Sequence, residues 1–298
     1  MNRVLHIQLL VLLLSLTIIS FESVHATRRA LVIGIGAYPE STGWSPINGD
    51  KDIVVVENML VEKGFSHDNI RKLTNEQATA AGIREALQQL VQISQKNDFV
   101  YIHFSGHGQR ITDTNGDEAS GYDEAWIPYD AHLHYSEASG FIFKSGGYSG
   151  QNHLIDDELN EYLHQLRQKI GQNGKIIVVA DACHSGGSTR KLDDEAEEET
   201  VVIRGTSDDF VIPSPRKTAK VGGYDLEWIF ISACKSTQCN YEYHGSGSLT
   251  YAMSQLADRF DELTCTDLQK QIRDIMRHIV RYVQTPTVES SNPDGKFF

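Results

Sequence analysis

Residues 175–187 read KIIVVADACHSGG, and this junction between an apolar run and a glycine-rich loop decides how the fold is interpreted. The almost continuous apolar run from Lys175 to Ala180 is typical of a strand covered on both faces, as in a parallel sheet. The polar residues that follow indicate a loop at the carboxyl end of that strand. Because ligands of open parallel sheets bind outside the carboxyl ends of the strands, a functional site is expected in this loop.

Three further runs have the same apolar, β-branched character: Arg29 to Ile35, Phe99 to Phe104 and Trp228 to Ser232. Between the runs lie segments whose apolar residues recur at helical spacing. We predict helices at Asp52 to Lys63, Thr79 to Gln95, Ile155 to Ile170 and Thr266 to Val283. Strands that alternate with helices of this length predict βαβ units and an α/β fold with a doubly wound sheet.

Two segments interrupt this alternation. Ile111 to Gly150 is rich in Gly, Ser, Asp and Tyr, and we expect at most short strands in it, such as Phe141 to Phe143. Gly186 to Leu226 is a second irregular stretch, and it contains an acidic run from Asp193 to Glu199. A structureless connection of about 40 residues inside a compact domain is usually functional or mobile, so we predict a long mobile loop at about 186–226.

The composition is that of an ordinary globular protein, since 40% of the 298 residues are hydrophobic and 24 are glycine. This excludes disordered, collagen-like and coiled-coil chains. Lysine and arginine number 27 against 40 aspartates and glutamates, a net charge of -13. That balance argues against nucleic acid as a partner, because phosphate binding needs a basic surface. Cationic partners fit it better, although an acidic surface that only keeps the protein soluble is the simpler explanation.

Residues 1–26 have the organisation of a signal peptide. Arg3 supplies a positive n-region, Leu9 to Ile19 is an apolar stretch, and Val24-His25-Ala26 has small residues at the two positions that the peptidase reads. We therefore predict an exported protein, periplasmic or secreted, whose mature chain begins near Thr27 and has no contact with a membrane. The alternative is an uncleaved membrane anchor, for which the apolar stretch is short.

Export places the four cysteines in a compartment where disulfides persist; they are Cys183, Cys234, Cys239 and Cys265. No C-x-x-C spacing occurs, so structural zinc is not expected. If Cys183 stays a thiol, at most one internal disulfide can form among the other three.

The loops after two strands supply a histidine and a cysteine. Ser105-Gly106-His107-Gly108 follows one strand, and Asp181-Ala182-Cys183 follows another. The carboxyl ends of both strands meet at one sheet edge, next to glycines that allow close backbone approach. A thiol, a base that takes its proton and free amides for an oxyanion are what nucleophilic catalysis by cysteine requires.

His107 is the better of two nearby candidates for the base. His184 is adjacent to Cys183, and neighbouring side chains that leave a strand point away from each other. His103 lies inside a strand and is expected to be structural. The alternative for Cys183 is a small buried core residue, but the glycine-rich sequence after it favours a loop at a strand end.

These motifs resemble the paired motifs of caspase-like cysteine peptidases, most closely those of the metacaspase type. Further resemblances run through the mature chain, 27–298, in the family's order: Leu31-Val32-Ile33-Gly34-Ile35, Gly116-Asp117-Glu118 through Gly121-Tyr122-Asp123-Glu124, Ile155-Asp156-Asp157-Glu158, Ile231-Ser232-Ala233-Cys234 with Gln238 and Glu242, and Gln284-Thr285-Pro286. The resemblance implies the caspase/hemoglobinase fold, a three-layer sandwich with a mostly parallel central sheet between helices. It also implies that the 186–226 loop separates a large-subunit-like part from a small-subunit-like part.

The resemblance implies a cysteine endopeptidase that cleaves after Arg or Lys. Cys183 would be the nucleophile, His107 the general base and acid, and the amides of Gly108 and Cys183 the oxyanion hole. The family's acidic S1 pocket, which binds the side chain before the cleaved bond, would contain Asp52, Ser105 and Asp181. A carboxylate there selects a cationic side chain by charge pairing.

Two alternatives concern this pocket. Asp52 stands at a predicted helix start, so it is also a candidate N-cap. Lys51, next to it, could pair with an acid and weaken the pocket. A third alternative concerns the whole chain, which would then be a catalytically silent caspase-like module that binds basic partners through an acidic cleft.

No cofactor is required by this chemistry, but many metacaspases are activated by calcium. The resemblance places a calcium site at Asp123, Asp156 and Asp157. The family's fourth acid corresponds to Arg190 here, so calcium binding requires a substitute such as Asp193 or Asp194, because hard cations need several oxygen ligands.

The 186–226 loop corresponds to the segment that caspase-like enzymes cut in themselves. Basic residues suited to such self-processing are Arg190, Lys191, Arg204, Arg216, Lys217 and Lys220. The alternative is a solvated linker that is never cut. The expected partners are protein or peptide substrates with basic residues, and the family expectation for the oligomeric state is a monomer.

Overall fold

The computed structural model describes residues 26–133, 148–183, 202–206, 208–212 and 227–298. The first 25 residues of the predicted signal peptide, the predicted strand at Phe141 to Phe143 and most of the 186–226 loop lie outside these ranges. Within them, no helix is long and apolar enough to cross a membrane.

A six-stranded sheet forms the centre of the molecule, in the order β11-β8-β7-β3-β1-β2. Its five parallel strands are joined at one edge by an antiparallel β11, so the predicted mostly parallel sheet is confirmed. The strands are β1 (Arg28–Gly34), β2 (Ile70–Thr74), β3 (Phe99–Ser105), β7 (Lys175–Asp181), β8 (Ile229–Ser232) and β11 (Thr287–Glu289).

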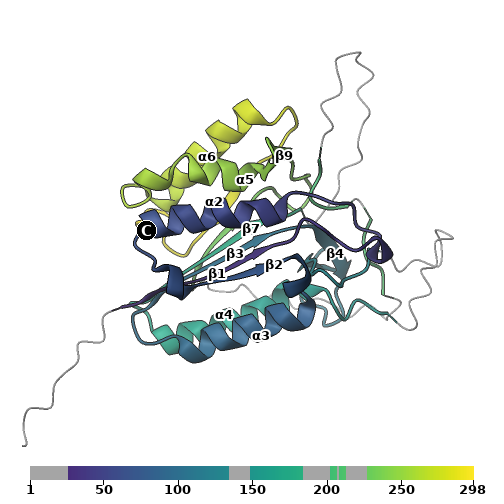
Figure 1. The fold of residues 1–298 in the computed structure, drawn as a ribbon, viewed down its shortest axis with the longest axis horizontal. Helices are drawn as coiled ribbons and strands as arrows, with labels where there is room; N and C mark the ends of the chain where they lie inside the picture. The colour runs from purple at the N-terminus through teal and green to yellow at the C-terminus, as the bar shows by residue number, and fades with distance from the viewer. Residues whose placement is uncertain (1–25, 134–147, 184–201, 207, 213–226) are drawn as a thin grey trace, which may run out of the picture.

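Helices cover both faces of this sheet, as Figure 1 shows. On one face lie α2 (Gly49–Glu62), α5 (Ser248–Ser254) and α6 (Cys265–Ile279), and on the other lie α3 (Ala80–Ile93) and α4 (Asp156–Ile170). All four predicted helices are present, with ends that differ by a few residues. The predicted three-layer arrangement is therefore confirmed.

Two apolar cores lie between these layers. Successive side chains of a strand point to opposite faces, so Leu31 and Ile33 of β1 pack toward α3 and α4, whereas Val32 packs toward α2 and α6. All seven residues of β3 are buried. This double burial explains why the central strands are continuously apolar in sequence.

A second, three-stranded antiparallel sheet lies beyond one end of the central sheet (Figure 1). It consists of β4 (Gly108–Thr112), β5 (Tyr122–Trp126) and β6 (Leu154–Ile155). We expected no more than short strands between Ile111 and Gly150, and the end of β4 and all of β5 fall in that stretch. Both strands are short and contain polar residues, so their sequence pattern is weaker than that of the continuously apolar central strands.

The remaining elements are short. They are the 3-10 helices η1 (Glu40–Thr42), η2 (His67–Asn69), η3 (Asn75–Gln77) and η4 (Ala257–Arg259), and the ribbon of β9 (Glu242–Tyr243) and β10 (Ser246–Gly247).

The register of the central strands sets the position of the site: Gly34 pairs with Ser105, and Ser105 pairs with Asp181. The carboxyl ends of β1, β3 and β7 are therefore level.

Candidate active site

Cys183 lies two residues beyond β7 and is fully buried. Its thiol donates a hydrogen bond to the carbonyl oxygen of Gln238 (2.8 Å), and the thiol of Cys234 donates to the same oxygen (3.2 Å). The contact with the Cys234 thiol, together with burial, raises the pKa of Cys183. All four cysteines are free thiols. In this arrangement Cys183 is protonated rather than a thiolate.

His107 lies two residues beyond β3, at the same sheet edge as Cys183. Its Nε2 is 2.9 Å from the carbonyl oxygen of Ser45, so Nε2 carries the proton and donates it. Its Nδ1 is buried and has no hydrogen-bond partner among the described residues. Burial lowers the pKa of His107 to about 4. The imidazole is therefore neutral at pH 7, with an available lone pair on Nδ1.

The orientation of this ring is fixed by aromatic neighbours. The rings of Tyr38 and Trp44 lie 4.9 Å and 4.7 Å from the His107 ring, centroid to centroid. The Tyr38 hydroxyl accepts a hydrogen bond from the His107 amide (3.0 Å) and donates one to the carbonyl of Ile127 (2.9 Å). Tyr38 thus ties the histidine loop to the chain after β5.

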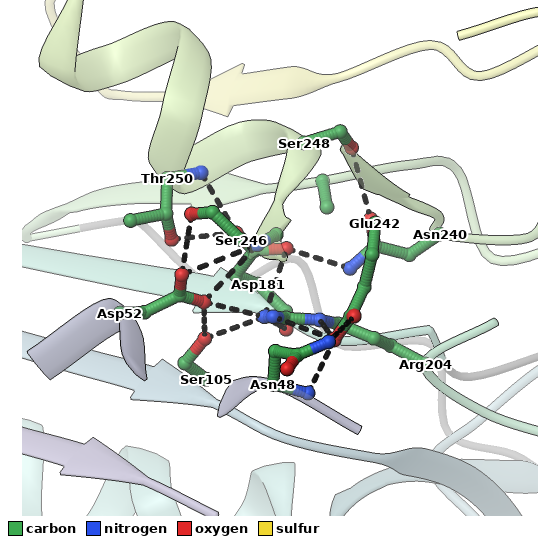
Figure 2. Close-up of polar contacts among 12 residues, drawn as sticks. Asn48, Asp52, Ser105, Asp181, Arg204, Asn240, Glu242, Ser246, Ser248 and Thr250 are labelled. Carbon is green, nitrogen blue, oxygen red and sulfur yellow. Dashed lines mark hydrogen bonds and ion pairs between the residues drawn. The ribbon is translucent and has the colours of Figure 1, made fainter. Parts of the chain in front are cut away.

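Asp52, Ser105 and Asp181 converge on one buried pocket, as the resemblance implied (Figure 2). Asp52 belongs to the first turn of α2, and its carboxylate accepts a short hydrogen bond from the Ser105 hydroxyl. The helix N-cap is Asn48, so the capping alternative for Asp52 is wrong. Lys51 contacts the Asn48 side chain rather than an acid of the pocket.

The pocket is occupied by the side chain of Arg204, which is fully buried. One guanidinium nitrogen of Arg204 lies 2.7 Å from the carboxylate of Asp52, 2.6 Å from the Ser105 hydroxyl and 3.7 Å from the carboxylate of Asp181. Its Nε donates to Glu242 (3.0 Å). Burial opposes the charged guanidinium, but the three carboxylates outweigh it and raise the pKa of Arg204.

The pKa values of Asp52 and Asp181, which both lie beside Arg204, are shifted in opposite directions. Burial opposes ionisation of Asp52, but Arg204 and the hydroxyls of Ser105 and Ser246 outweigh it and lower its pKa. Burial and the nearby Asp52 raise the pKa of Asp181, against the attraction of Arg204. A cation in the pocket is thus needed to hold two carboxylates side by side in a buried place.

The backbone around Arg204 runs through the site like a bound peptide. The carbonyl oxygen of Arg204 accepts a hydrogen bond from the amide of Cys183 (2.8 Å), and its amide donates to the carbonyl of Asn240 (3.0 Å). Two residues upstream, the carbonyl of Val202 accepts from the amide of Glu242 (3.0 Å). The segment therefore pairs with residues 240–242 as an added antiparallel strand, in the manner of peptide recognition by strand addition.

Gly205 follows Arg204 and lies directly against Cys183. A Cβ atom on Gly205 would be 2.5 Å from the carbonyl oxygen and 2.8 Å from the Cβ of Cys183, so no side chain fits there. Gly205 also forms a parallel bridge with Gly108. Of the two predicted oxyanion-hole donors, the Cys183 amide contacts the Arg204 carbonyl, and Gly108 lies beside the next residue.

Several pocket residues were not predicted as binding residues. Asp181 accepts hydrogen bonds from the Asn240 side chain (2.7 Å) and from the amide and hydroxyl of Thr250 (2.7 and 2.6 Å). Glu242 also accepts from Asn48 (2.6 Å). Gly247 leaves space for the pocket, because a Cβ there would be 2.1 Å from Asp181 and 2.4 Å from Arg204. The only signal in the sequence was the resemblance around Glu242.

An acidic cluster lies at the second sheet, separate from the pocket. Carboxylate oxygens of Asp113, Asp117 and Asp123 lie within 4.8 Å of one another. Burial and the neighbouring acids raise the pKa of Asp123 to about 7 and that of Asp156 to about 8. Asp157 is linked to the cluster by a short hydrogen bond from Asn115. Oxygen-rich, anionic surroundings of this kind suit a hard cation.

This cluster differs in membership from the predicted calcium site. Asp123 is common to both, and Asp113 and Asp117 were not predicted. Arg190, Asp193 and Asp194 lie outside the described residues. A buried carboxylate oxygen of Asp123 has no hydrogen-bond partner within the described chain, and an oxygen of this kind fits a cation ligand.

A thiol, a neutral imidazole and an amide donor lie at the carboxyl edge of a mostly parallel sheet, and these are the groups that cysteine hydrolases use. The sequence profile of the caspase domain matches residues 27–298. The chain therefore belongs to the caspase-domain family of cysteine-type endopeptidases, and within it to the metacaspase type.

Individual relatives agree with this assignment. Metacaspase-1 of Mycosarcoma maydis is 24% identical over 92% of this chain and 72% of that protein. Metacaspase-1 of Candida albicans is 35% identical over 56% of this chain, and Metacaspase-7 of Arabidopsis thaliana is 30% identical over 67% of it. The matched regions are 35% and 42% of those two proteins, so this chain spans less than half of their length.

A crystal structure of a Geobacter sulfurreducens protein has the same fold. It superimposes with a TM-score of 0.59 at 22% sequence identity, over 88% of this chain and 92% of the other. At this identity the match confirms the α/β fold alone.

Proposed function

We propose that the protein is an exported cysteine endopeptidase that hydrolyses peptide bonds after arginine or lysine, with Cys183 as nucleophile and His107 as general base. The occupied pocket is the observation that carries this proposal. The buried guanidinium of Arg204 is surrounded by Asp52, Asp181 and Glu242. We expect the side chain of a substrate arginine to bind to the same three carboxylates. Lysine would reach the same carboxylates with a smaller charged group.

The geometry supports a two-stage reaction. His107 Nδ1 takes the proton of the Cys183 thiol, and the sulfur attacks the carbonyl carbon of the residue in the pocket. The Cys183 amide stabilises the oxyanion. His107 then donates the proton to the leaving amine, and a thioester remains on Cys183. Water, deprotonated by His107, attacks the thioester and releases the acid and the free thiol.

Peptide hydrolysis tests this proposal. Fluorogenic peptides that differ only in having Arg, Lys, Gln or Asp before the cleaved bond are incubated with the purified parent protein and with Cys183→Ala. We expect cleavage of the Arg and Lys peptides that disappears in Cys183→Ala. Cleavage that persists in that variant contradicts the nucleophile, and preference for Asp contradicts the pocket. A parent chain that cleaves none of these peptides and does not cut itself would support the silent binding module instead.

Asp52 provides a sharper test of the pocket. Asp52→Asn removes the carboxylate that lies closest to the guanidinium, and we expect KM for the Arg peptide to rise about tenfold or more, because a buried charge pair is broken. Asp52→Asn combined with Asp181→Asn should also lower kcat, since the bound side chain orients the reacting carbonyl. Glu62→Gln, an exposed acid on the same helix, is the matched control.

We also propose that the chain cleaves itself between Arg204 and Gly205. The Arg204 side chain fills the pocket and its carbonyl accepts a hydrogen bond from the Cys183 amide, which is the arrangement expected of a bound substrate. Incubation of the purified chain should produce a fragment that begins at Gly205, identified by mass spectrometry. Arg204→Gln should abolish that fragment, and its continued appearance would contradict the assignment.

Calcium regulation is a further part of the proposal. Asp123, Asp156 and Asp157, with Asp113 and Asp117 nearby, would supply the oxygen ligands, and the ion would neutralise their mutual repulsion. We expect calcium to raise the melting temperature of the parent protein and not that of Asp123→Asn. Asp258→Asn, an exposed acid elsewhere, should respond as the parent does. Equal stabilisation of all three proteins would contradict the site.

Export and a monomeric state complete the proposal. Both rest on the sequence: residues 1–26 have the organisation of a signal peptide, and relatives of this type lead us to expect a monomer. N-terminal sequencing of the protein recovered outside the cytoplasm should begin near Thr27. Light scattering of the purified protein should give the mass of one chain.

A further inference from the structure

The bond between Arg204 and Gly205 is held on both sides of the active site. Upstream, Val202 and Arg204 pair with residues 240–242, as described above. Downstream, beyond residue 207, which lies outside the described chain, residues 208–212 lie along β4. We call residues 208–212 the downstream anchor. The chemistry of peptide hydrolysis does not require this segment.

The backbone of the downstream anchor extends the second sheet. Phe210 donates a hydrogen bond to the carbonyl of Arg110 (2.7 Å) and accepts one from the amide of Thr112 (2.9 Å), which forms a parallel bridge opposite Ile111. The amide of Ile212 donates to the Thr112 hydroxyl (2.9 Å). The anchor is thus a short added strand with its own hydrogen bonds.

The side chain of Phe210 is fully buried in a small apolar core. Its ring lies 5.7 Å from that of Tyr148, edge to face, and 4.7 Å from that of His153. Gly150 leaves the necessary room, because a Cβ there would be 3.3 Å from the Phe210 ring and 2.5 Å from Ile111. Because this buried aromatic side chain packs against its neighbours, it attaches the segment firmly to the second sheet.

Polar contacts fix the two residues before Phe210. The carboxylate of Asp209 accepts two hydrogen bonds from the Arg110 guanidinium, 2.8 and 3.0 Å long. The carbonyl of Asp208 accepts one from the buried side chain of Gln109 (2.7 Å), whose own oxygen contacts His153 (3.0 Å). The bidentate geometry specifies both the register and the direction of the segment.

The two attachment points are close together. Gly205 is opposite Gly108 and Phe210 is opposite Ile111, so the two sites are three residues apart on β4, about 10 Å at the rise of a strand. Holding Phe210 therefore keeps Gly205 within a short tether of Cys183. A reacting group restrained in this way reacts as if at high local concentration.

We propose that the downstream anchor positions the chain for self-cleavage, so that Phe210 and Asp209 direct Cys183 to the Arg204–Gly205 bond rather than to the other basic residues of the 186–226 loop. This inference rests on the proposed self-processing. Phe210 and Asp209 are positioning residues, because neither contacts the reacting atoms.

The experiment compares the full-length parent with Phe210→Ala, Phe210→Leu, Asp209→Asn and Val211→Ala. Val211 is adjacent but 47% exposed, so its variant is the matched control. Mass spectrometry follows the appearance of the Gly205 end and of any other new end. A short Arg peptide then measures kcat and KM of each protein once processing is complete, and thermal unfolding verifies that each variant is folded.

We expect Phe210→Ala to slow the formation of the Gly205 end by about tenfold or more, given the loss of a buried aromatic group, and to increase cutting at other basic residues. Asp209→Asn should slow it by a few fold, because its ion pair is partly exposed. Phe210→Leu should restore most of the rate, Val211→Ala should match the parent, and peptide kcat/KM should be unchanged throughout.

Parental rates and a parental cleavage site in both Phe210→Ala and Asp209→Asn would overturn the inference. Equal losses of peptide kcat/KM and of self-cleavage would also overturn it, since they would indicate general damage to the site. If the parent hydrolyses the peptide but never cuts itself, this inference fails while the endopeptidase stands. If the parent does neither, the proposed function fails and the inference falls with it.

Discussion

The carbonyl oxygen of Arg204 accepts a hydrogen bond from the backbone amide of Cys183, and the two atoms are 2.8 Å apart. The residue that fills the pocket therefore also occupies the amide that we propose as the oxyanion donor. An external peptide cannot bind in the same way until Arg204 leaves. In the described structure, a segment of the protein's own chain thus occupies the pocket.

The first prediction concerns the stability supplied by Arg204. In a Cys183→Ala background, Arg204→Ala leaves three buried carboxylates without a counter-charge, and we expect the free energy of unfolding to fall by about 3–5 kcal/mol. Butylguanidine should restore part of the loss by entering the pocket. Chemical denaturation with and without this ligand provides the measurement.

Butylurea, which has a similar shape and no charge, is the control ligand. Equal stabilisation by butylguanidine and butylurea would show that the pocket does not select charge. Butylguanidine should have little effect on the protein that retains Arg204, because the pocket is filled.

A second prediction concerns Tyr38, which holds the loop of His107. Tyr38→Phe leaves the buried amide of His107 without its acceptor, at a cost of about 1–3 kcal/mol. Because the imidazole loses its fixed position, we expect kcat for the Arg peptide to fall about tenfold while KM stays within about twofold. Tyr162→Phe on α4, far from the site, should behave as the parent. A change confined to KM would contradict this role.

The third prediction concerns the thiol of Cys234 beside Cys183, the proposed nucleophile. Contact with Cys234 and burial favour the neutral form of Cys183 and raise its pKa. Cys234→Ala should lower that pKa, so that alkylation of Cys183 by iodoacetamide reaches its half-maximal rate at a lower pH in the self-processed protein. Cys265→Ala, a substitution at the start of α6, should leave the profile unchanged. Identical profiles for all proteins would contradict the role of Cys234.

The fourth prediction concerns pH and His103, which is buried in β3 near Asp52 and Arg204. Burial lowers its pKa from 6.5 to about 4, so between these values the unfolded chain binds a proton that the folded chain does not. The contribution of neutral His103 is complete above pH 6.5 and is lost as the pH falls toward 4, by about 1.4 kcal/mol per pH unit.

His103→Gln removes this dependence. Urea denaturation of parent and variant at pH 7, 6 and 5 should therefore give a stability difference that shrinks or reverses in favour of the variant as the pH falls. His107 and His153 have pKa values lowered in the same direction, but they are present in both proteins and cancel in the comparison. A pH-independent difference would contradict the assignment.

The central fold could be predicted because its strands are buried on both faces. Continuous apolar runs identify β1, β3, β7 and β8, and the polar residues after β3 and β7 must then meet at one edge. β2 escaped prediction because Arg71 and Lys72 interrupt a short strand at the sheet edge, where one side of the backbone faces solvent.

The occupant of the pocket could not be predicted from the sequence. Arg204 is one of several basic residues in an irregular loop, and nothing in its local sequence distinguishes it from Arg216 or Lys217. Its place depends on hydrogen bonds to Asn240 and Cys183, which are distant in sequence. The same reason applies to Asn240 and Thr250, whose contacts with Asp181 follow from tertiary packing rather than from a periodic pattern.

The pocket and the arginine within it are parts of one polypeptide, and this has a consequence for how its specificity can change. A mutation that removed the pocket's acids would leave Arg204 buried without partners, so the free energy of unfolding of the altered protein would fall. Under the proposed function, a change in the substrate preference of this pocket would therefore lower the stability of the protein before any external peptide is bound. A pocket for a different side chain would have to be inherited together with a new residue at position 204.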